Sequence, residues 1–352
     1  MTSQPTPNAT IAVDLVLATR PKASTGIERY ALNLFEALGS IAPDTIGFVD
    51  DASSLPQAPN LIRVKGGFKG WLSLPTTPAF RQHKIGTLLC PAFPPSPLVV
   101  ASKLPVARII HDDFPWTRGH AMNLRGRMLF RHFEGLAAPR YASIFAPTDL
   151  MAQSLTQILR RDVGTIGNAP GIDLSKAPPQ ATRKPQVVAV GTIEPRKNYE
   201  ALVAAQRHLP QDWSVAVVGR NGWGPIAEAW DGHVAAAQGR LAWHGHASDE
   251  TLLGLYRESS CFVSMSLAEG FNMPLVEAGS LGLPVVCSDI EIHRSVAPPW
   301  ARFVPLSIAP EELARIVTET AQTPPDAAAV ETYRNTFSWG SIARNIKNRI
   351  AP

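Results

Sequence analysis

The stretch that most constrains the fold of this chain runs from Ser264 to Asp289 and reads SMSLAEGFNMPLVEAGSLGLPVVCSD. An apolar run leads into a loop, and Pro274 then opens a predicted short helix, because a proline in the first turn of a helix loses no hydrogen bond. Gly279 and Gly282 are expected to close this helix, and an apolar strand follows at residues 283–286. A strand, a loop and a helix start in this order predict a ligand site at the carboxyl edge of a parallel sheet.

Two glutamates lie in this stretch, eight residues apart. Glu269 is on the loop and Glu277 is expected in the first turn of the helix, where a carboxylate faces the positive end of the helix dipole. Both can reach one polar ligand. The alternative is that Glu277 is only a favoured surface residue and Glu269 a solvated loop charge.

The pattern formed by residues 269–271, Pro274 and Glu277 resembles the E-G-F-x-x-P-x-x-E signature of retaining GT-B glycosyltransferases. It is most similar to the family-4 group, which contains many mannosyltransferases. Asn272 departs from the family pattern, which often has glycine there, although asparagine tolerates unusual backbone angles better than most residues. The resemblance covers most of the chain and is clearer after about residue 181.

The length of 352 residues favours two domains over one. No apolar run approaches the roughly 18 residues of a membrane span, and the first residues lack the pattern of a signal peptide. Cys90, Cys261 and Cys287 are scattered without a zinc or disulfide spacing, which favours a reducing cytoplasm. We therefore expect a cytoplasmic protein, attached at most to the inner face of a membrane.

Apolar and amphipathic patterns predict alternating strands and helices. Strands are expected at residues 10–17, 46–49, 87–90, 106–110, 143–146, 187–190, 214–218, 241–243, 261–263 and 283–286, and helices at 30–38, 149–159, 199–208, 248–256, 310–320 and 342–350. With the resemblance, this order implies an α/β GT-B fold of two Rossmann-like domains that face an interdomain cleft. The expected parts are an acceptor-side domain at 1–175, a nucleotide-sugar domain at 176–335, and a C-terminal helix at 336–352 that packs back across the domains.

The formal net charge of +4 is mildly basic and comes without a dense Lys/Arg block. It fits phosphate-bearing ligands or an anionic surface, and we expect no nucleic-acid partner. Residues 118–140 are predicted to form a basic helix that contacts anionic lipid or a phosphate-bearing acceptor; a solvated helix face is the alternative. A loop facing the acceptor is expected at residues 66–78.

Two candidate sites lie in the first domain. Residues 24–29 join a strand to a helix and can offer free backbone N–H groups to an anion; an ordinary turn is the alternative. The resemblance places Gly26 beside the donor diphosphate, where its lack of a Cβ permits close approach. His111 follows a strand and coincides with the family's His-Asp motif, which implies that it faces the reacting sugar; the alternative is a structural histidine.

The second domain opens with a strand, then Gly191 and the pair Arg196 and Lys197 before a helix. Such a pair predicts an electropositive pocket, since guanidinium and ammonium groups bind phosphate. Cations there stabilise a departing diphosphate more in the transition state than in the ground state. A surface ion pair is the alternative, but the residues match the family's R-K-N motif.

The resemblance assigns the remaining roles. Glu277 would accept hydrogen bonds from the ribose. Glu269, with the backbone of Gly270, Phe271 and Asn272, would hold the sugar hydroxyls. Together with His111, Arg196 and Lys197, Glu269 is a candidate catalytic residue. No metal is expected, because the sequence has no Asp-x-Asp motif.

The implied reaction is transfer of a sugar to an acceptor hydroxyl with retained configuration, the departing phosphate taking the acceptor's proton. GDP-mannose is the expected donor, and a glycan or lipid-linked oligosaccharide in polysaccharide biosynthesis the expected acceptor. A UDP-sugar donor and a catalytically inactive binding subunit stay open. An epimerase would lack the paired glutamates, and a phosphorylase would need a pyridoxal-binding lysine site.

Overall fold

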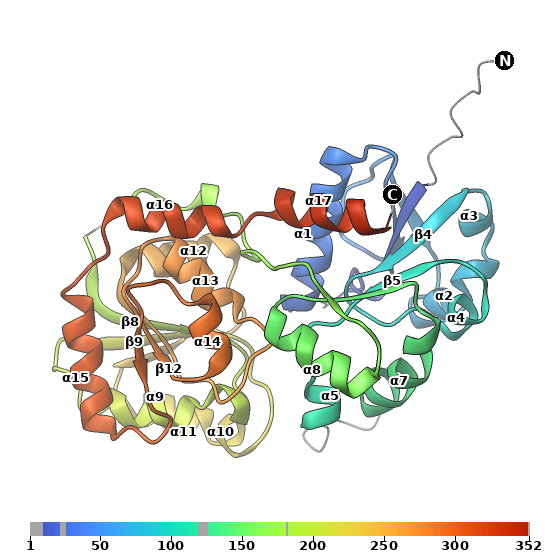
Figure 1. Cartoon of the computed structure of the whole chain (residues 1–352). Coiled ribbons are helices and arrows are strands. Elements are labelled where there is room, and N and C mark those ends of the chain that lie inside the picture. The colour runs from blue at the N-terminus through green and yellow to red at the C-terminus, as the bar shows by residue number, and fades with distance from the viewer. Residues whose placement is uncertain (1–9, 22–25, 119–125, 181, 351–352) are drawn as a thin grey trace. The chain divides into compact units, whose positions relative to one another are not determined.

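The computed structural model describes residues 10–21, 26–118, 126–180 and 182–350 (Figure 1). The chain forms two units, residues 1–169 with 338–352 (unit 1) and residues 170–337 (unit 2). Residues 170–175, assigned above to the first domain, fall in unit 2. Each unit is an α/β domain built on a parallel sheet.

Unit 1 contains a seven-stranded sheet in the order β3-β2-β1-β4-β5-β6-β7, with every adjacent pair parallel. Its strands are β1 (Thr10–Leu15), β2 (Ile46–Asp50), β3 (Leu61–Val64), β4 (Ile85–Cys90), β5 (Val106–Ile109), β6 (Ser143–Ala146) and β7 (Gly164–Thr165). The five predicted strands of this half are confirmed. The sequence analysis missed β3 and β7, which are four and two residues long.

The helices of unit 1 connect these strands. They are α1 (Gly26–Ile41), α2 (Phe68–Ser73), α3 (Pro78–Arg81), α4 (Pro97–Ala101), α5 (Phe114–Thr117), a π-helical segment (Arg127–Phe133), α7 (Glu134–Ala137), α8 (Asp149–Leu159) and α17 (Trp339–Ile350). The loop predicted at residues 66–78 is wrong, because this segment forms α2 and a 3₁₀ turn. Buried Trp71 anchors it by donating its indole N–H to Pro94 O at 3.2 Å.

The C-terminal helix α17 belongs to unit 1 and packs along α1 (Figure 1). Ile342, Ile346 and Ile350 recur every four residues and are all buried, so one face of the helix is apolar. Lys347 Nζ donates to Ile41 O at 3.0 Å at the end of α1. The predicted helix is confirmed.

Unit 2 contains a six-stranded parallel sheet in the order β10-β9-β8-β11-β12-β13. Its strands are β8 (Lys184–Val190), β9 (Ser214–Val218), β10 (Leu241–Trp243), β11 (Ser259–Ser264), β12 (Val285–Ser288) and β13 (Arg302–Val304). Its helices are α9 (Tyr199–Gln206), α10 (Pro225–Glu228), α11 (Trp230–Ala236), α12 (Asp249–Glu258), α13 (Met273–Ser280), α14 (Glu291–Val296), α15 (Pro310–Ala321) and α16 (Ala327–Thr336).

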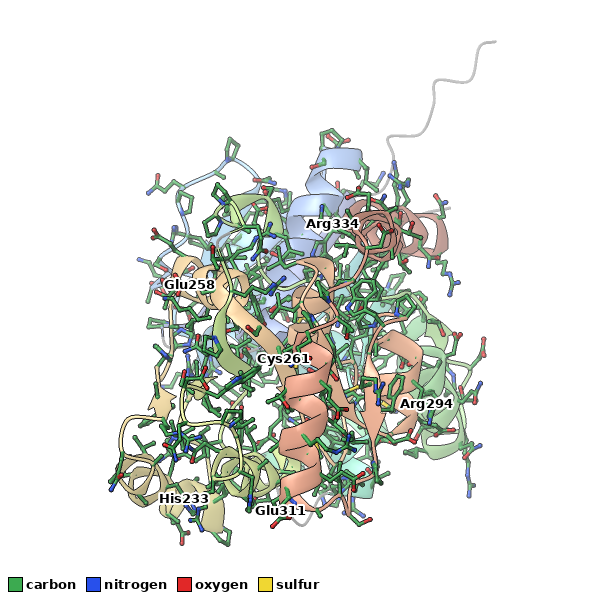
Figure 2. All side chains as sticks on the ribbon, turned by 90° about the vertical axis from the view of Figure 1, so that its left-hand side faces the viewer. His233, Glu258, Cys261, Arg294, Glu311 and Arg334 are labelled. Atoms are coloured by element: carbon green, nitrogen blue, oxygen red, sulfur yellow. The ribbon has the colours of Figure 1, made fainter. Side chains whose placement is uncertain are left out.

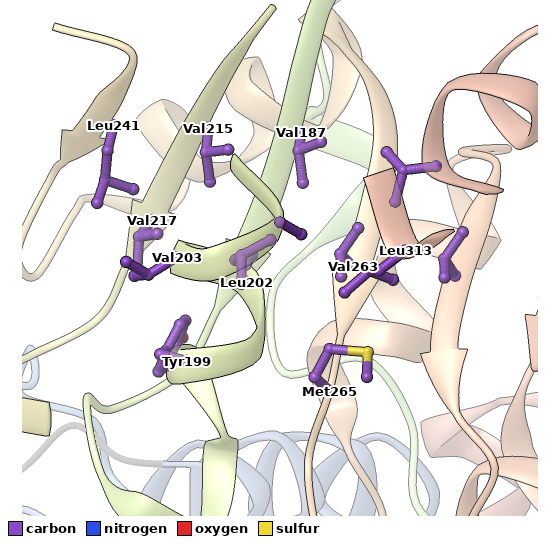
Figure 3. Close-up of a cluster of buried hydrophobic side chains, with 14 of the residues drawn as sticks. Val187, Tyr199, Leu202, Val203, Val215, Val217, Leu241, Val263, Met265 and Leu313 are labelled. Atoms are coloured by element: carbon purple, nitrogen blue, oxygen red, sulfur yellow. The ribbon is translucent and has the colours of Figure 1, made fainter. Parts of the chain in front are cut away.

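The core of unit 2 packs helices against one face of this sheet (Figure 3). Val215 and Val217 on β9 face Leu202 and Val203 on α9, and Val263 on β11 packs in the same cluster. Full burial of one such side chain contributes about 1.5–3 kcal/mol. The packing fixes α9 on the sheet, and with it the turn that precedes α9.

Candidate active site

The centre of the candidate site is a buried charge cluster in unit 2. Arg196 Nη1 lies 2.6 Å from Glu269 Oε2, and Lys197 Nζ lies 2.5 Å from Glu269 Oε1. Arg196 Nη2 also contacts Glu194 Oε1 at 2.5 Å. Ser266 Oγ donates to Glu269 Oε1 at 2.7 Å. The structure thus brings together three of the four predicted catalytic residues.

Two connections after adjacent strands build this cluster. Arg196 and Lys197 lie on a 3₁₀ turn, Pro195–Lys197, between β8 and α9, and Glu269 lies on the loop between β11 and α13. The backbone joins the two, since Leu267 N donates to Arg196 O at 2.8 Å. Because β8 and β11 are parallel neighbours, both connections emerge at the carboxyl edge of the sheet.

Gly191, a predicted donor-binding residue, makes room for the lysine. A Cβ at this position would lie 2.9 Å from Lys197 Cε, and its φ of +153° is in the region that favours glycine. Gly191 O accepts a hydrogen bond from Tyr199 OH at 2.9 Å. Any larger residue at 191 would therefore displace Lys197 from Glu269.

The charges of the cluster are balanced. Burial alone would raise the pKa of Glu269, but the adjacent Lys197 and Arg196 charges outweigh it and hold that pKa well below its ordinary value. Burial lowers the pKa of Lys197, which Glu269 partly offsets. With Glu194 as a second carboxylate, two cations meet two anions, so the predicted electropositive pocket is neutral in the ligand-free chain.

The rest of the Glu269 loop is held tightly. Phe271 is buried and its ring meets that of Phe337 edge-on, with centroids 5.9 Å apart. Asn272 has φ 74° and ψ 66°, a left-handed conformation, at the start of α13. The Phe271 side chain packs in the core, and contact of the backbone at 270–272 with a sugar stays a prediction.

Glu277 lies deeper than predicted. It is the fifth residue of α13 and is 4% exposed, so the prediction that it occupies the first turn is wrong. Its Oε1 accepts from Gly171 N and its Oε2 from Tyr256 OH, both at 2.9 Å. The carboxylate thus anchors the start of unit 2 to α12 and α13. Its contact with a ribose stays a prediction.

The predicted catalytic residue of unit 1 is His111. His111 follows β5 and its Nε2 lies 2.6 Å from Pro91 O, so this nitrogen carries the proton and Nδ1 is an acceptor. Burial lowers the His111 pKa to about 4, which keeps the ring neutral at neutral pH. The edge-on ring of Tyr30, with centroids 4.6 Å apart, fixes its orientation. Its role towards a sugar stays a prediction.

Some predicted features fall partly outside the described residues. Gly26 is the first residue of α1, but residues 22–25 of the predicted anion-binding loop are not described. The same holds for residues 119–125 of the predicted basic helix. The described part of that segment includes two exposed apolar side chains, Met128 and Leu136, which are 56% and 74% exposed.

Within the described residues, no three His, Cys, Asp or Glu side chains lie together in a way that could hold a metal ion. None of the helices within the described ranges has the length and apolar character needed to cross a membrane.

Unit 2 is similar in sequence to a known family of proteins. The model of the family described as glycosyl transferases group 1 matches residues 172–335, which lie within unit 2. The serotype-specific mannosyltransferase WbdA of Escherichia coli is 34% identical over 140 residues, 38% of this chain. The match spans only 17% of that relative's length.

Solved structures resemble the whole chain in fold. Sucrose-phosphate synthase from Thermosynechococcus elongatus has a TM-score of 0.75 at 18% identity, covering 97% of this chain and 98% of that protein. Anabaena HepE, solved in complex with UDP and glucose, has a TM-score of 0.69 at 14% identity, covering 97% and 98%. These likenesses confirm the predicted GT-B class with its two Rossmann-like domains.

Sequence reasoning missed the residues that hold the Glu269 loop in place. Ser266, Ser288 and His293 bond to the loop or to one another, although they carry no recognisable motif. Only the short spacing between Ser266 and Glu269 could have suggested a contact. His293 comes from α14, more than twenty residues beyond the loop, and no pattern marked it.

Proposed function

We propose that this chain is a retaining glycosyltransferase that moves mannose from GDP-mannose to a hydroxyl of a glycan or lipid-linked oligosaccharide in polysaccharide biosynthesis. The observation that carries the proposal is the buried Arg196–Glu269–Lys197 cluster in the unit that matches the group 1 model. The mannosyltransferase WbdA supports mannose as the transferred sugar. We place the reaction in the cytoplasm or at the inner face of its membrane.

In this mechanism the bound donor replaces the ion pairs between Glu269 and the two cations. The diphosphate takes hydrogen bonds from Arg196 and Lys197, and the Glu269 carboxylate turns to the sugar hydroxyls. Because its pKa is held low, Glu269 is charged and acts as an acceptor only. As the glycosidic bond breaks, negative charge grows on the diphosphate, and the two cations stabilise it most at the transition state.

Attack from the front face of the sugar explains both the retained configuration and the fate of the acceptor's proton. The acceptor hydroxyl attacks the face of the sugar from which the diphosphate departs, and the departing phosphate takes the proton. No second carboxylate is then needed as a base. Arg196 and Lys197 supply the positive charge that a metal would otherwise bring. Neutral His111 would offer its Nδ1 lone pair to a sugar hydroxyl.

A donor hydrolysis and transfer assay tests this function. GDP-mannose is incubated with the chain, with and without mannose-containing oligosaccharides, and the anomeric configuration of the product is read by NMR. The proposal requires release of GDP that depends on Lys197, and an α-linked product. An inverted product would contradict retention, and release of GDP unchanged in Lys197→Ala would contradict the site.

Two alternatives are favoured by specific observations. HepE has also been solved in complex with UDP-glucose, so a UDP-sugar donor here is the second candidate. A catalytically inactive sugar-binding subunit is the third, favoured by the charge balance that leaves the cluster neutral. Nucleotide-sugar binding without turnover on any donor would support that alternative.

A further inference from the structure

His293 lies at the centre of a buried hydrogen-bond network beneath the Glu269 loop. It is on α14 and is 0% exposed, whereas its neighbour Arg294 is exposed (Figure 2) and pairs with Asp289. His293 Nδ1 lies 2.9 Å from Ser288 O, and its Nε2 lies 2.8 Å from Asn272 Nδ2. The ring therefore connects β12 with the residue at which α13 begins.

This geometry fixes the tautomer of the ring. A carbonyl oxygen only accepts, so Nδ1 carries the proton and donates to Ser288 O. Nε2 is then the acceptor for the Asn272 amide, which also donates to Ser264 Oγ at 3.0 Å. Burial lowers the His293 pKa, which is consistent with a neutral ring.

The same network also connects His293 with Glu269, through Ser288 and Ser266. Ser288 Oγ donates to Ser266 O at 2.5 Å, and Ser266 Oγ donates to Glu269 Oε1. His293 is thus bonded to Asn272 at one end of the loop and, through Ser288 and Ser266, is connected to Glu269 at the other. Both ends belong to the segment that the proposed function assigns to the donor sugar.

An asparagine at position 272 makes the folded chain less stable than a glycine would. Its backbone is left-handed, and its Oδ1 is buried with no hydrogen-bond partner within the described residues. An unsatisfied buried acceptor costs about 1–3 kcal/mol, and glycine would adopt the same backbone conformation without strain. The amide is therefore better explained by its bond to His293 than by stability.

We propose that neutral His293 is a positioning residue that, through Asn272, holds the Glu269 loop in the conformation that binds the donor sugar. The inference rests on the proposed function and adds to it His293 on α14 and the side chain of Asn272, whose backbone alone was assigned above. His293 does not touch the donor. It sets the backbone at 270–272 and limits the movement of Glu269.

Calorimetric titration with two probes, GDP and GDP-mannose, tests this role. In His293→Phe, the Kd for GDP-mannose should rise by about tenfold, as expected for a lost buried hydrogen bond. The Kd for GDP should stay within about twofold, because GDP lacks the sugar to which the proposed function assigns the contacts of residues 269–272. His208→Phe makes the same change at an exposed histidine and should alter neither value.

Rescue and coupling separate positioning from a merely structural role. His293→Gln keeps an acceptor for the Asn272 amide and should recover most of the GDP-mannose affinity. Asn272→Gly keeps the backbone but removes the amide, so it should reproduce the His293→Phe loss, and the double variant should be no worse than either single one.

Two results would overturn the inference. Equal losses for GDP and GDP-mannose in His293→Phe would indicate general disruption of the fold, and additive losses in the double variant would show that the two residues act separately. If the wild-type chain bound neither GDP-mannose nor UDP-glucose, the proposed function would fail and this inference with it. Normal donor binding that His293→Phe leaves unchanged would overturn the inference alone.

Discussion

Glu269 keeps its negative charge although only 7% of the residue is exposed. Burial opposes the charge, and the two cations beside it restore it. A buried carboxylate that loses one such partner is left uncompensated, which typically costs about 3–5 kcal/mol. Lys197 and Arg196 therefore keep the Glu269 carboxylate charged inside the protein.

The first prediction concerns Lys197. Lys197→Ala should lower kcat for donor turnover by a factor of about 10²–10³, because a preorganised charge facing the leaving group is lost. The control is Lys184→Ala, which removes an exposed lysine paired with Glu258 at 2.5 Å. Steady-state kinetics on both variants check the prediction. Equal kcat in the two variants would exclude a role of Lys197 in turnover.

The second prediction concerns Glu277. Glu277→Ala should weaken nucleotide binding and also lower stability by about 1–3 kcal/mol, since Gly171 N loses its acceptor. Tyr256→Phe removes the hydroxyl that donates to Glu277 Oε2 and also lies 3.4 Å from Pro274 O, and it should leave nucleotide affinity unchanged. Calorimetry and urea unfolding separate the two effects. Full nucleotide affinity in Glu277→Ala would show that this residue is purely structural.

The third prediction concerns pH and Asp14 on β1. Burial raises the pKa of Asp14 to about 7, although Val16 N–H and Arg108 act in the opposite direction. The folded state then binds the Asp14 proton more tightly than the unfolded state, so the contribution of Asp14 to stability is greatest at low pH and is lost as pH rises from about 4 to about 7. Asp14→Asn should flatten this slope in urea unfolding between pH 5 and pH 8. If the free energy of unfolding of Asp14→Asn depended on pH as it does in the wild-type chain, the role of Asp14 would be contradicted.

At the level of residues, the sequence predicted the site residues that belong to a recognisable motif. Arg196, Lys197 and Glu269 were expected to act together, and they are in contact. His293 and Ser288 could not be predicted, because contacts between distant segments depend on tertiary packing and neither residue stands in a recognisable pattern. The charge balance of the cluster could not be predicted for the same reason, since the ion pair between Glu194 and Arg196 also depends on the folded turn.

At the level of elements, hydrophobic patterns predicted the buried strands well and the boundaries of α13 poorly. The helix begins at Met273, one residue before the proline, and Asn272 precedes it in a left-handed conformation. Gly279 does not end the helix but lies inside it, where a Cβ would come within 2.7 Å of the Tyr333 ring. Close packing, rather than helix termination, explains this glycine.

The fourth prediction tests an element. Ile346 on α17 is fully buried in unit 1. Ile346→Ala should lower the free energy of unfolding by about 2–5 kcal/mol, the range for large-to-small changes in a core. Arg344→Ala, on the exposed face of the same helix, is the control and should change stability by less than about 0.5 kcal/mol. Similar values for the two variants would contradict the packing of α17.

At the level of the whole molecule, two parallel-sheet units carry different chemistry. Unit 2 holds the charged cluster, and unit 1 holds His111 with a neutral ring. The alternation of strands and helices predicted this architecture, because such a pattern forms a parallel sheet covered by helices. The nucleotide base of the donor could not be predicted in this way. Its recognition depends on backbone contacts, which no pattern of side chains reveals.

The most direct test of the central claim is calorimetric titration of the wild-type chain and Lys197→Ala with GDP, UDP, ADP, GDP-mannose, UDP-glucose and UDP-N-acetylglucosamine. The account predicts selective binding of GDP and GDP-mannose by the wild-type chain, with weaker GDP binding in Lys197→Ala because the diphosphate loses a cation. Preference for UDP compounds would replace the proposed donor and keep the site. Absence of binding across the whole set would contradict the assignment of unit 2 as a nucleotide-sugar site.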